Sequence, residues 1–218
     1  MGKILRVIRL RLARFLEFAL TYLPGPPARL LEIGCGGGDL ARALADAGYD
    51  VTAIDPEAPE GPIFRRVTLE DFIDDGGGFD AIVASVSLHH VHDLDAAFDK
   101  VAALLKPGGV LVLEEFAKER LRGATADWYY AERKRRDDDG ELPDDVETWF
   151  RGWDERHGIH PWEDLHRALA GRFEERYVGG VPYLYDFRLE DELEPVERRL
   201  IESGTIDATG IRYVGTRR

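Results

Sequence analysis

The chain has 218 residues, 44% of them hydrophobic, which is enough for one ordinary domain with a full apolar core. The formal net charge is −13; residues 1–20 contribute +4, from five basic side chains against Glu17, which leaves −17 on the remainder. Such an acidic body repels phosphate backbones and argues against a nucleic-acid substrate.

Residues 1–23 read as an amphipathic helix and not as a signal peptide, because arginines interrupt every apolar run and no small-residue cleavage site follows. Apolar residues share one face of this helix, and charged residues lie opposite: Ile4, Ile8, Leu12, Phe15, Leu16 and Ala19 against Lys3, Arg6, Arg14 and Glu17. The pattern favours packing on the domain itself or across a homodimer over binding to a membrane surface. No apolar run approaches the roughly 18 to 20 residues of a membrane span, so no stable membrane association is expected.

After the prolines at 24–27, strand-like and helix-like patterns alternate, which is typical of a doubly wound α/β fold with a parallel sheet and helices on both faces. The expected strands are 28–33, 49–55, 63–67, 79–85 and 109–116, with a terminal strand near 210–218. The expected helices are 39–47, 93–105, 161–171 and 191–203.

The stretch LLEIGCGGGDL, residues 30–40, places four glycines in a turn between a buried strand and a helix, where a ligand needs close backbone approach. A P-loop would end in Gly-Lys-Ser/Thr, and this turn ends in Gly-Asp-Leu, so that hypothesis fails. A nicotinamide or flavin site favours G-x-G-x-x-G, but counting from Gly34 gives Gly36 and then Asp39. Asp55, at the end of the second strand, suits a ribose in either kind of nucleotide site and does not decide between them.

Further motifs distinguish between these kinds of nucleotide site. Glu32 precedes an E-x-G-x-G-x-G pattern, and IDPE, TLEDF, SLHHV and LKPGG follow in order. Together they resemble the class I S-adenosylmethionine-dependent methyltransferases, especially the small-molecule type related to ubiquinone-biosynthesis methyltransferases. The resemblance runs through residues 28–116 and continues more faintly in the last two strands. It implies a Rossmann-like seven-stranded sheet of order 3-2-1-4-5-7-6, mostly parallel, with an antiparallel last strand.

The resemblance also implies a cofactor site for S-adenosylmethionine and its product S-adenosylhomocysteine. Glu32 and the turn would face the methionine portion, Asp55 would accept hydrogen bonds from both ribose hydroxyls, and Ser85 would lie beside the sulfonium. The loop at 68–70 would bracket the adenine. The full expected set is Glu32, Gly34, Cys35, Gly36, Gly38, Asp55, Pro56, Thr68, Leu69, Glu70 and Ser85.

His89 and His90 follow the fourth strand, at the edge where open α/β sheets bind ligands, and are the candidate catalytic residues. A role in fixing the turn is the alternative and is slightly favoured, because positioning alone drives methyl transfer. No metal is expected: the histidines are too closely spaced for a helical pair, and no cysteine joins them. Glu114 and Glu115 end the fifth strand, and only one of them faces the pocket because neighbouring strand residues point to opposite faces. Glu114 is taken as a candidate substrate contact.

Residues 120–165 hold all four tryptophans and are expected to form a helical, aromatic-rich insertion after the fifth strand. Loops at the ligand edge carry specificity, so this insertion is expected to set substrate choice, with Trp128 and Tyr129 as candidate contacts. The alternative is a small helical subdomain in which the tryptophans form a core of their own, and the two interpretations are compatible. Residues 137–139 fail as a calcium loop and read as solvated.

The sequence therefore predicts a single methyltransferase domain over 1–218, with a helix at 1–23, a cofactor-binding core at 28–116, an insertion or lid at 120–165, and C-terminal strands and helix at 172–218. The expected function is S-adenosylmethionine-dependent methyl transfer to an O, N or C atom of a small molecule. A dinucleotide-dependent oxidoreductase and a non-catalytic, cofactor-binding regulatory relative are the alternatives. The single cysteine, Cys35, excludes an internal disulfide and suits the cytoplasm.

Overall fold

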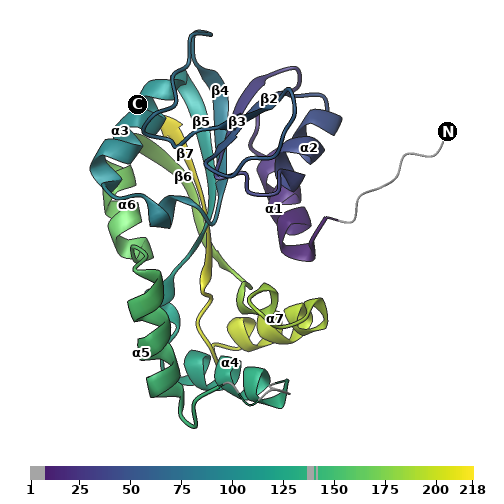
Figure 1. The fold of residues 1–218 in the computed structure, drawn as a ribbon, viewed down its shortest axis with the longest axis vertical. Coiled ribbons are helices and arrows are strands. Elements are labelled where there is room, and N and C mark those ends of the chain that lie inside the picture. The colour runs from purple at the N-terminus through teal and green to yellow at the C-terminus, as the bar shows by residue number, and fades with distance from the viewer. Residues whose placement is uncertain (1–7, 137–139, 141) are drawn as a thin grey trace, which may run out of the picture.

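A seven-stranded sheet forms the centre of the molecule in the computed structural model (Figure 1), which describes residues 8–136, 140 and 142–218, without the side chains of 153–157. The strands are β1 (Arg29–Ile33), β2 (Asp50–Asp55), β3 (Phe64–Arg66), β4 (Phe79–Ser85), β5 (Leu105–Phe116), β6 (Phe173–Val181) and β7 (Gly210–Arg217). Their order in the sheet is β3-β2-β1-β4-β5-β7-β6. The fold class and the strand order expected from the sequence are confirmed.

Only β7 runs against the other strands, pairing antiparallel with β5 and with β6, while the remaining pairs are parallel. The strand order reverses between β1 and β4, because β1 pairs with β2 on one side and with β4 on the other. In an open α/β sheet, a crevice for ligands lies at the carboxyl end of such a reversal.

Helices cover both faces of the sheet, as the alternation of the sequence predicts. Helices α1 (Leu10–Leu20) and α2 (Asp39–Asp46) pack on one face with one set of strand residues, such as Leu30 and Val83. Helices α3 (Leu94–Leu104) and α6 (Trp162–Ala170) pack on the other face, with the alternate set, such as Leu31 and Ile82. Both faces of the central strands are therefore apolar, which is typical of a parallel sheet buried between helix layers.

The N-terminal helix packs on its own domain. Phe15 and Ala19 of α1 are fully buried in the cluster that α1 shares with α2 and the sheet, and Phe18 contacts Tyr22 and Tyr177 of β6. The start of the predicted helix, including Ile4, lies outside the described residues, and the helix of the structure begins at Leu10. Among the described residues, no helix is both long and apolar enough to cross a membrane.

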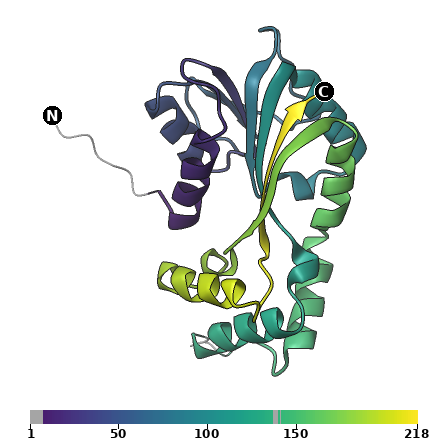
Figure 2. The ribbon, with the colours of Figure 1, turned by 180° about the vertical axis from the view of Figure 1, so that it is seen from behind.

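A second lobe lies next to the carboxyl ends of the parallel strands. Figures 1 and 2 show α4 (Ala124–Arg135), α5 (Val146–His157) and α7 (Glu194–Glu202) gathered there, away from the two helix layers. Tyr129 and Trp149 are buried at its centre with their rings 5.2 Å apart, so these aromatic residues form a core of their own. Trp162, near the end of the predicted insertion, packs instead in the hydrophobic cluster that α3 and α6 share with the sheet.

The segment KPGG lies within β5 and not before it. The sequence predicts a helix to residue 105 and a strand from 109, but pairing between β4 and β5 already begins at Leu105. The register shifts between Phe79 and Ala81, and Gly108 has a positive φ of 75°, so the strand accommodates the turn as an irregularity.

A buried carboxylate fixes the segment that follows β6. Glu197 of α7 is 0% exposed and accepts hydrogen bonds from the backbone N–H groups of Tyr183, Leu184 and Tyr185 at 2.8, 3.0 and 2.9 Å. Burial raises the pKa of this carboxyl despite these three bonds. The segment is thereby attached to α7, and its aromatic rings pack against the end of β5, where Tyr183 stacks on Phe116.

We expect Glu197→Leu to lower the free energy of unfolding by at least about 2 kcal/mol, because three buried amides lose their acceptor. Urea denaturation measures this change. Glu202→Ala removes an exposed carboxylate from the same helix and is expected to stay within about 0.5 kcal/mol of wild type. Equal effects of the two substitutions would contradict the structural role of Glu197.

Candidate functional site

A cavity of about 620 Å³ lies at the carboxyl ends of β1, β2 and β4, where the strand order reverses. Its size falls within the range of small-molecule sites. Three segments line it: the glycine turn with the end of β2, the loop after β3, and the turn after β4. The lining residues are Ile33, Gly34, Gly36, Ile54, Asp55, Pro56, Val67, Thr68, Leu69, Glu70, Val86, Ser87, Leu88, His90, Val91 and His92.

The glycine turn after β1 approaches the turn after β4 so closely that residue 34 has no room for a side chain. Gly34 has a φ of 76°, and a Cβ built there would lie 2.2 Å from Cβ of Ser87. The hydroxyl of Ser87 donates a hydrogen bond to the carbonyl of Ile33 at 2.8 Å, which fastens the two turns together. Gly36, which lines the cavity, is open, because a Cβ there would meet nothing within 4 Å.

Asp55 ends β2 at the rim of the cavity, and its carboxylate is already oriented by backbone groups. One oxygen accepts from the N–H of Gly36 at 3.0 Å and the other from the N–H of Glu57 at 2.8 Å. A carboxylate has about four lone-pair sites, so each oxygen retains one for a ligand. The arrangement presents a preoriented acceptor pair to the cavity.

Glu32 lies within β1, 3% exposed, and is not among the cavity-lining residues. One of its carboxylate oxygens has no hydrogen-bond partner among the described residues. Burial raises the pKa of this carboxyl to about 8, and a backbone hydrogen bond from Ala41 opposes the rise. Buried polar atoms are nearly always hydrogen-bonded, so this oxygen is available to a partner such as water or a ligand.

The loop at 68–70 forms the wall opposite the turn after β4. The hydroxyl of Thr68 accepts from the backbone N–H of Asp71 at 3.2 Å, which closes a local turn. Leu69 is buried and lines the cavity beside Val67, so this wall offers an apolar surface.

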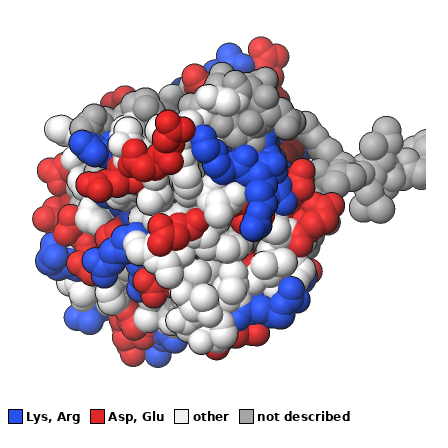
Figure 3. Space-filling model, turned by 90° about the horizontal axis from the view of Figure 1, so that it is seen from below, with Lys and Arg blue, Asp and Glu red and all other residues white. Residues whose placement is uncertain are grey.

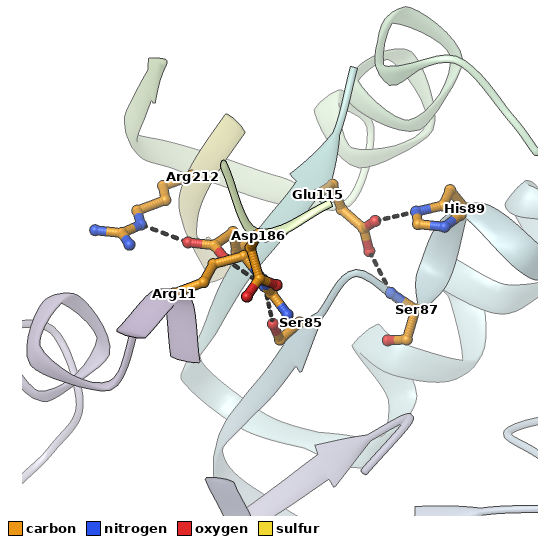
Figure 4. A network of polar contacts seen from close by, with 8 residues as sticks. Arg11, Ser85, Ser87, His89, Glu115, Asp186 and Arg212 are labelled. Atoms are coloured by element: carbon orange, nitrogen blue, oxygen red, sulfur yellow. Dashed lines mark hydrogen bonds and ion pairs between the residues drawn. The ribbon is translucent and has the colours of Figure 1, made fainter. Parts of the chain in front are cut away.

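The two candidate histidines have different environments. His90 is exposed and lines the cavity, whereas His89 is 3% exposed and does not. The ring of His89 turns away to Glu115, with Nδ1 2.5 Å from a carboxylate oxygen (Figure 4). The backbone N–H groups of Ser87 and Leu88 also donate to Glu115, at 3.3 and 2.9 Å.

Glu114 precedes Glu115 in β5 and so points to the opposite face; it belongs to a separate ion-pair network, whose arginines, Arg11 and Arg212, are labelled in Figure 4. Its oxygens accept from Arg11 of α1 at 2.6 Å and from Arg212 of β7 at 2.8 Å. Arg11 also donates to Ser85 at 3.0 Å and to Asp186 at 2.9 Å, so it joins α1 to two strand ends and to the second lobe.

The structure brings about half of the predicted site residues to the cavity. Those that line it are Gly34, Gly36, Asp55, Pro56, Thr68, Leu69, Glu70 and His90. Those outside the lining are Glu32, Cys35, Gly38, Ser85, His89, Glu114, Trp128 and Tyr129. Among the latter, Tyr129 is 1% exposed in the core of the second lobe and donates to the carbonyl of Phe187 at 2.7 Å.

Sequence reasoning missed several residues of the turn after β4, above all Val86 and Ser87. The sequence predicts the end of β4 at Ser85, as the structure has it, and places that serine beside the sulfonium, whereas Ser85 is not among the cavity-lining residues. Val86 has a φ of 56°, so the chain turns sharply and the next residue, Ser87, becomes the serine of the cavity wall. A positive φ at a β-branched residue has no sequence signal, because such residues rarely adopt it.

Comparisons with known proteins identify the family. A family model described as a methyltransferase domain matches residues 4–176, and the chain belongs to this family. The family membership expected from the glycine turn and its accompanying motifs is confirmed.

Curated relatives match a little under half of the chain. The ubiquinone biosynthesis O-methyltransferase of Xanthomonas campestris is 38% identical over 112 residues, which cover 45% of this chain and 47% of that protein. The enzyme of the same name from Xylella fastidiosa is 41% identical over 110 residues, 44% of this chain and 45% of that protein. The chain thus matches about half the length of these relatives.

Solved structures resemble the chain over almost its whole length. N-methyltransferase NodS from Bradyrhizobium japonicum, in complex with S-adenosylhomocysteine, has a TM-score of 0.56 at 18% identity, covering 95% of this chain and 85% of that one. An S-adenosylmethionine-dependent methyltransferase from Mesorhizobium loti has a TM-score of 0.57 at 19% identity, covering 95% and 100%. At these identities the likeness establishes the shared fold.

We expect the free energy of unfolding to fall as pH rises between about 4.5 and 8, in part through Glu32. The folded state holds the Glu32 proton up to about pH 8, while the unfolded state loses it near 4.5, so raising the pH favours unfolding. At about 1.4 kcal/mol per pKa unit, this contribution amounts to at most about 5 kcal/mol.

The measurement is urea denaturation of wild type and of Glu32→Gln between pH 5 and 8.5, with Glu17→Gln, an exposed carboxylate of α1, as the control. Stability should fall less steeply with pH in Glu32→Gln than in the other two proteins. Parallel curves for all three would refute the buried, protonated Glu32.

Proposed function

We propose that the protein transfers the methyl group of S-adenosylmethionine to an oxygen, nitrogen or carbon atom of a small molecule and releases S-adenosylhomocysteine. The observation that carries this proposal is the cavity at the strand reversal, with a glycine turn on one wall and the Asp55 carboxylate at its rim. Family membership supports the same activity.

The residues of the cavity fit this cofactor in shape and charge. Asp55 retains acceptor sites for a pair of ribose hydroxyls, and Gly36 leaves its backbone open to the ligand. Leu69 and Val67 offer an apolar wall for a flat base. Glu32 lies outside the cavity lining, in the strand that leads into the glycine turn, and its unpartnered buried oxygen would be satisfied by a cationic amino group.

The chemistry asks little of the protein beyond positioning. When bound, the cofactor supplies a methyl group already activated by its sulfonium. The protein has to hold the acceptor in line and exclude water, and the fastened turns at Gly34 and Ser87 provide a rigid wall for this purpose. His90 is the candidate histidine on the cavity side, while His89 is held by Glu115.

We propose that the methyl acceptor is a small molecule and that the protein acts in the cytoplasm. The formal charge of −13 disfavours phosphate backbones, and the face seen in Figure 3 mixes acidic and basic side chains around an uncharged area. The single free cysteine, Cys35, is buried and suits a reducing compartment. We treat residues 1–218 as one functional domain, in which the second lobe selects the acceptor, with Tyr129 in the core of that lobe and Trp128 packed against it.

Asp55→Ala should weaken binding of S-adenosylmethionine and S-adenosylhomocysteine by about 1.5 to 3 kcal/mol, the loss of charged hydrogen bonds to a ribose. Calorimetry measures both ligands, with NAD as the comparison nucleotide, and NAD is expected not to bind. Asp50→Ala, at the exposed amino end of the same strand, should bind like wild type. Binding of NAD, or an Asp55→Ala variant with wild-type affinity, would contradict the proposal.

Transfer itself is tested by incubating the protein with methyl-labelled S-adenosylmethionine and a fractionated small-molecule extract of the source cell. Label appearing in a small-molecule fraction supports the proposed activity and yields the acceptor. Cofactor binding without label in any fraction would favour a non-catalytic relative.

Once an acceptor is known, we expect His90→Asn to lower turnover by less than about 100-fold, because general-base catalysis is worth about 10² to 10⁴ and positioning alone drives methyl transfer. Turnover is measured against pH for this variant, for His89→Asn, and for His166→Asn, a histidine of α6 outside the cavity. A larger loss in His90→Asn, with intact cofactor affinity and without the acidic limb of the pH profile, would make His90 the base.

A further inference from the structure

The turn after β4 is strained, yet it forms one wall of the cavity. Val86 is β-branched and has a φ of 56°, a conformation that persists only where the surroundings impose it. The next residue, Ser87, lies so close to Gly34 that the two turns cannot approach each other further without a clash. Something must therefore hold this backbone in place.

Glu115 of β5 supplies that hold from behind the wall. It is 0% exposed, and one carboxylate oxygen accepts from the consecutive backbone N–H groups of Ser87 and Leu88. The other oxygen faces Nδ1 of His89 at 2.5 Å, so three successive residues converge on one carboxylate (Figure 4). Successive N–H groups that converge in this way form a concave anion site, filled here by the protein's own side chain.

The second lobe holds the same turn from outside. The backbone N–H of His160, in the segment between α5 and α6, donates to the carbonyl of His89 at 3.0 Å. The ring of His160 contacts the carbonyl of Val91 at 2.9 Å. On the inner side, the Ser87 hydroxyl bonds to Ile33 and the backbone N–H of Val86 donates to the carbonyl of Glu114 at 2.7 Å. The backbone amides of Ser87 and Leu88 are bound by Glu115.

We propose that Glu115 is a positioning residue of the cofactor site, acting through Ser87, Leu88 and His89 without touching the ligand. Its carboxylate fixes the distance between the turn after β4 and the glycine turn, and so sets the width of the cavity in advance of binding. This inference rests on the proposed function, because the ligand used to test it is S-adenosylhomocysteine.

Glu197 provides a matched control for a merely structural role. It is equally buried and also accepts from successive backbone amides, but those of Tyr183 to Tyr185, which do not line the cavity. If buried carboxylates only stabilise the fold, leucine at either position should have the same consequences for the ligand.

The experiment compares Glu115→Leu, Glu115→Gln and Glu197→Leu in the full-length protein. Calorimetry measures affinity for S-adenosylhomocysteine, and amide hydrogen exchange at Ser87 and Leu88 is followed by NMR in the ligand-free protein. Glu115→Leu should weaken the ligand by at least about tenfold and speed exchange at both amides, because the anchored wall is released. Glu197→Leu should lose stability but keep affinity within about threefold.

Glu115→Gln should restore affinity to within about threefold of wild type, because its amide oxygen still accepts from the two N–H groups. If Glu115→Leu does not fold, Glu115→Asp takes its place, since its shortened side chain cannot span both amides and His89. Wild-type affinity in the leucine or aspartate variant, or an equal loss in Glu197→Leu, overturns the inference. A wild-type protein that does not bind S-adenosylhomocysteine overturns the proposed function instead, and the exchange measurement still decides whether Glu115 anchors the turn.

Discussion

The close contact between Gly34 and Ser87 is the constraint on which the site depends. The strand order reverses between β1 and β4, so the helices that follow these neighbouring strands pack on opposite faces of the sheet. The crevice between them is the place where open α/β sheets bind ligands. Where the turns meet, a Cβ on residue 34 would lie 2.2 Å from Ser87, and the Ser87 hydroxyl is bonded to Ile33. Glycine at 34 is required by this approach as much as by its φ of 76°.

Three buried glutamates hold other parts of the structure in place, each through different partners. Glu115 binds backbone amides behind the cavity, Glu197 binds those of the segment after β6, and Glu114 is neutralised by Arg11 and Arg212. Burying a charge is costly unless hydrogen bonds or partners compensate for it. A carboxylate that binds three donors fixes their directions, so the segments held by Glu115 and Glu197 have a defined shape. The desolvation of the buried carboxylate offsets part of the free energy that these hydrogen bonds contribute.

The sequence predicts the sheet, its helix layers and the cavity's glycine wall well, because periodicity and local turn chemistry determine them. Phe15 and Ala19 were expected on the buried face of α1 and are fully buried there. Alternation along β5 implies that only one of Glu114 and Glu115 faces the turn after β4, but not which one; the structure gives this place to Glu115 and pairs Glu114 with arginines. Ser87 could not be predicted because a positive φ at a β-branched residue such as Val86 has no signal in the sequence. Trp128 and Tyr129 were expected at the substrate, and the structure gives the buried Tyr129 a core position.

Two sets of contacts connect the sheet and α1 to the second lobe. Arg11 ties α1 and the ends of β4 and β5 to Asp186 of the second lobe, while His160 ties the segment after α5 to the turn that carries His89. The cavity wall is therefore anchored to the sheet through Glu115 and to the lobe through His160. The two parts also share a side chain, because Val86 lines the cavity and packs against the aromatic core of the second lobe. A change in that core, or one that displaces His160, therefore acts on the turn that forms the cavity wall.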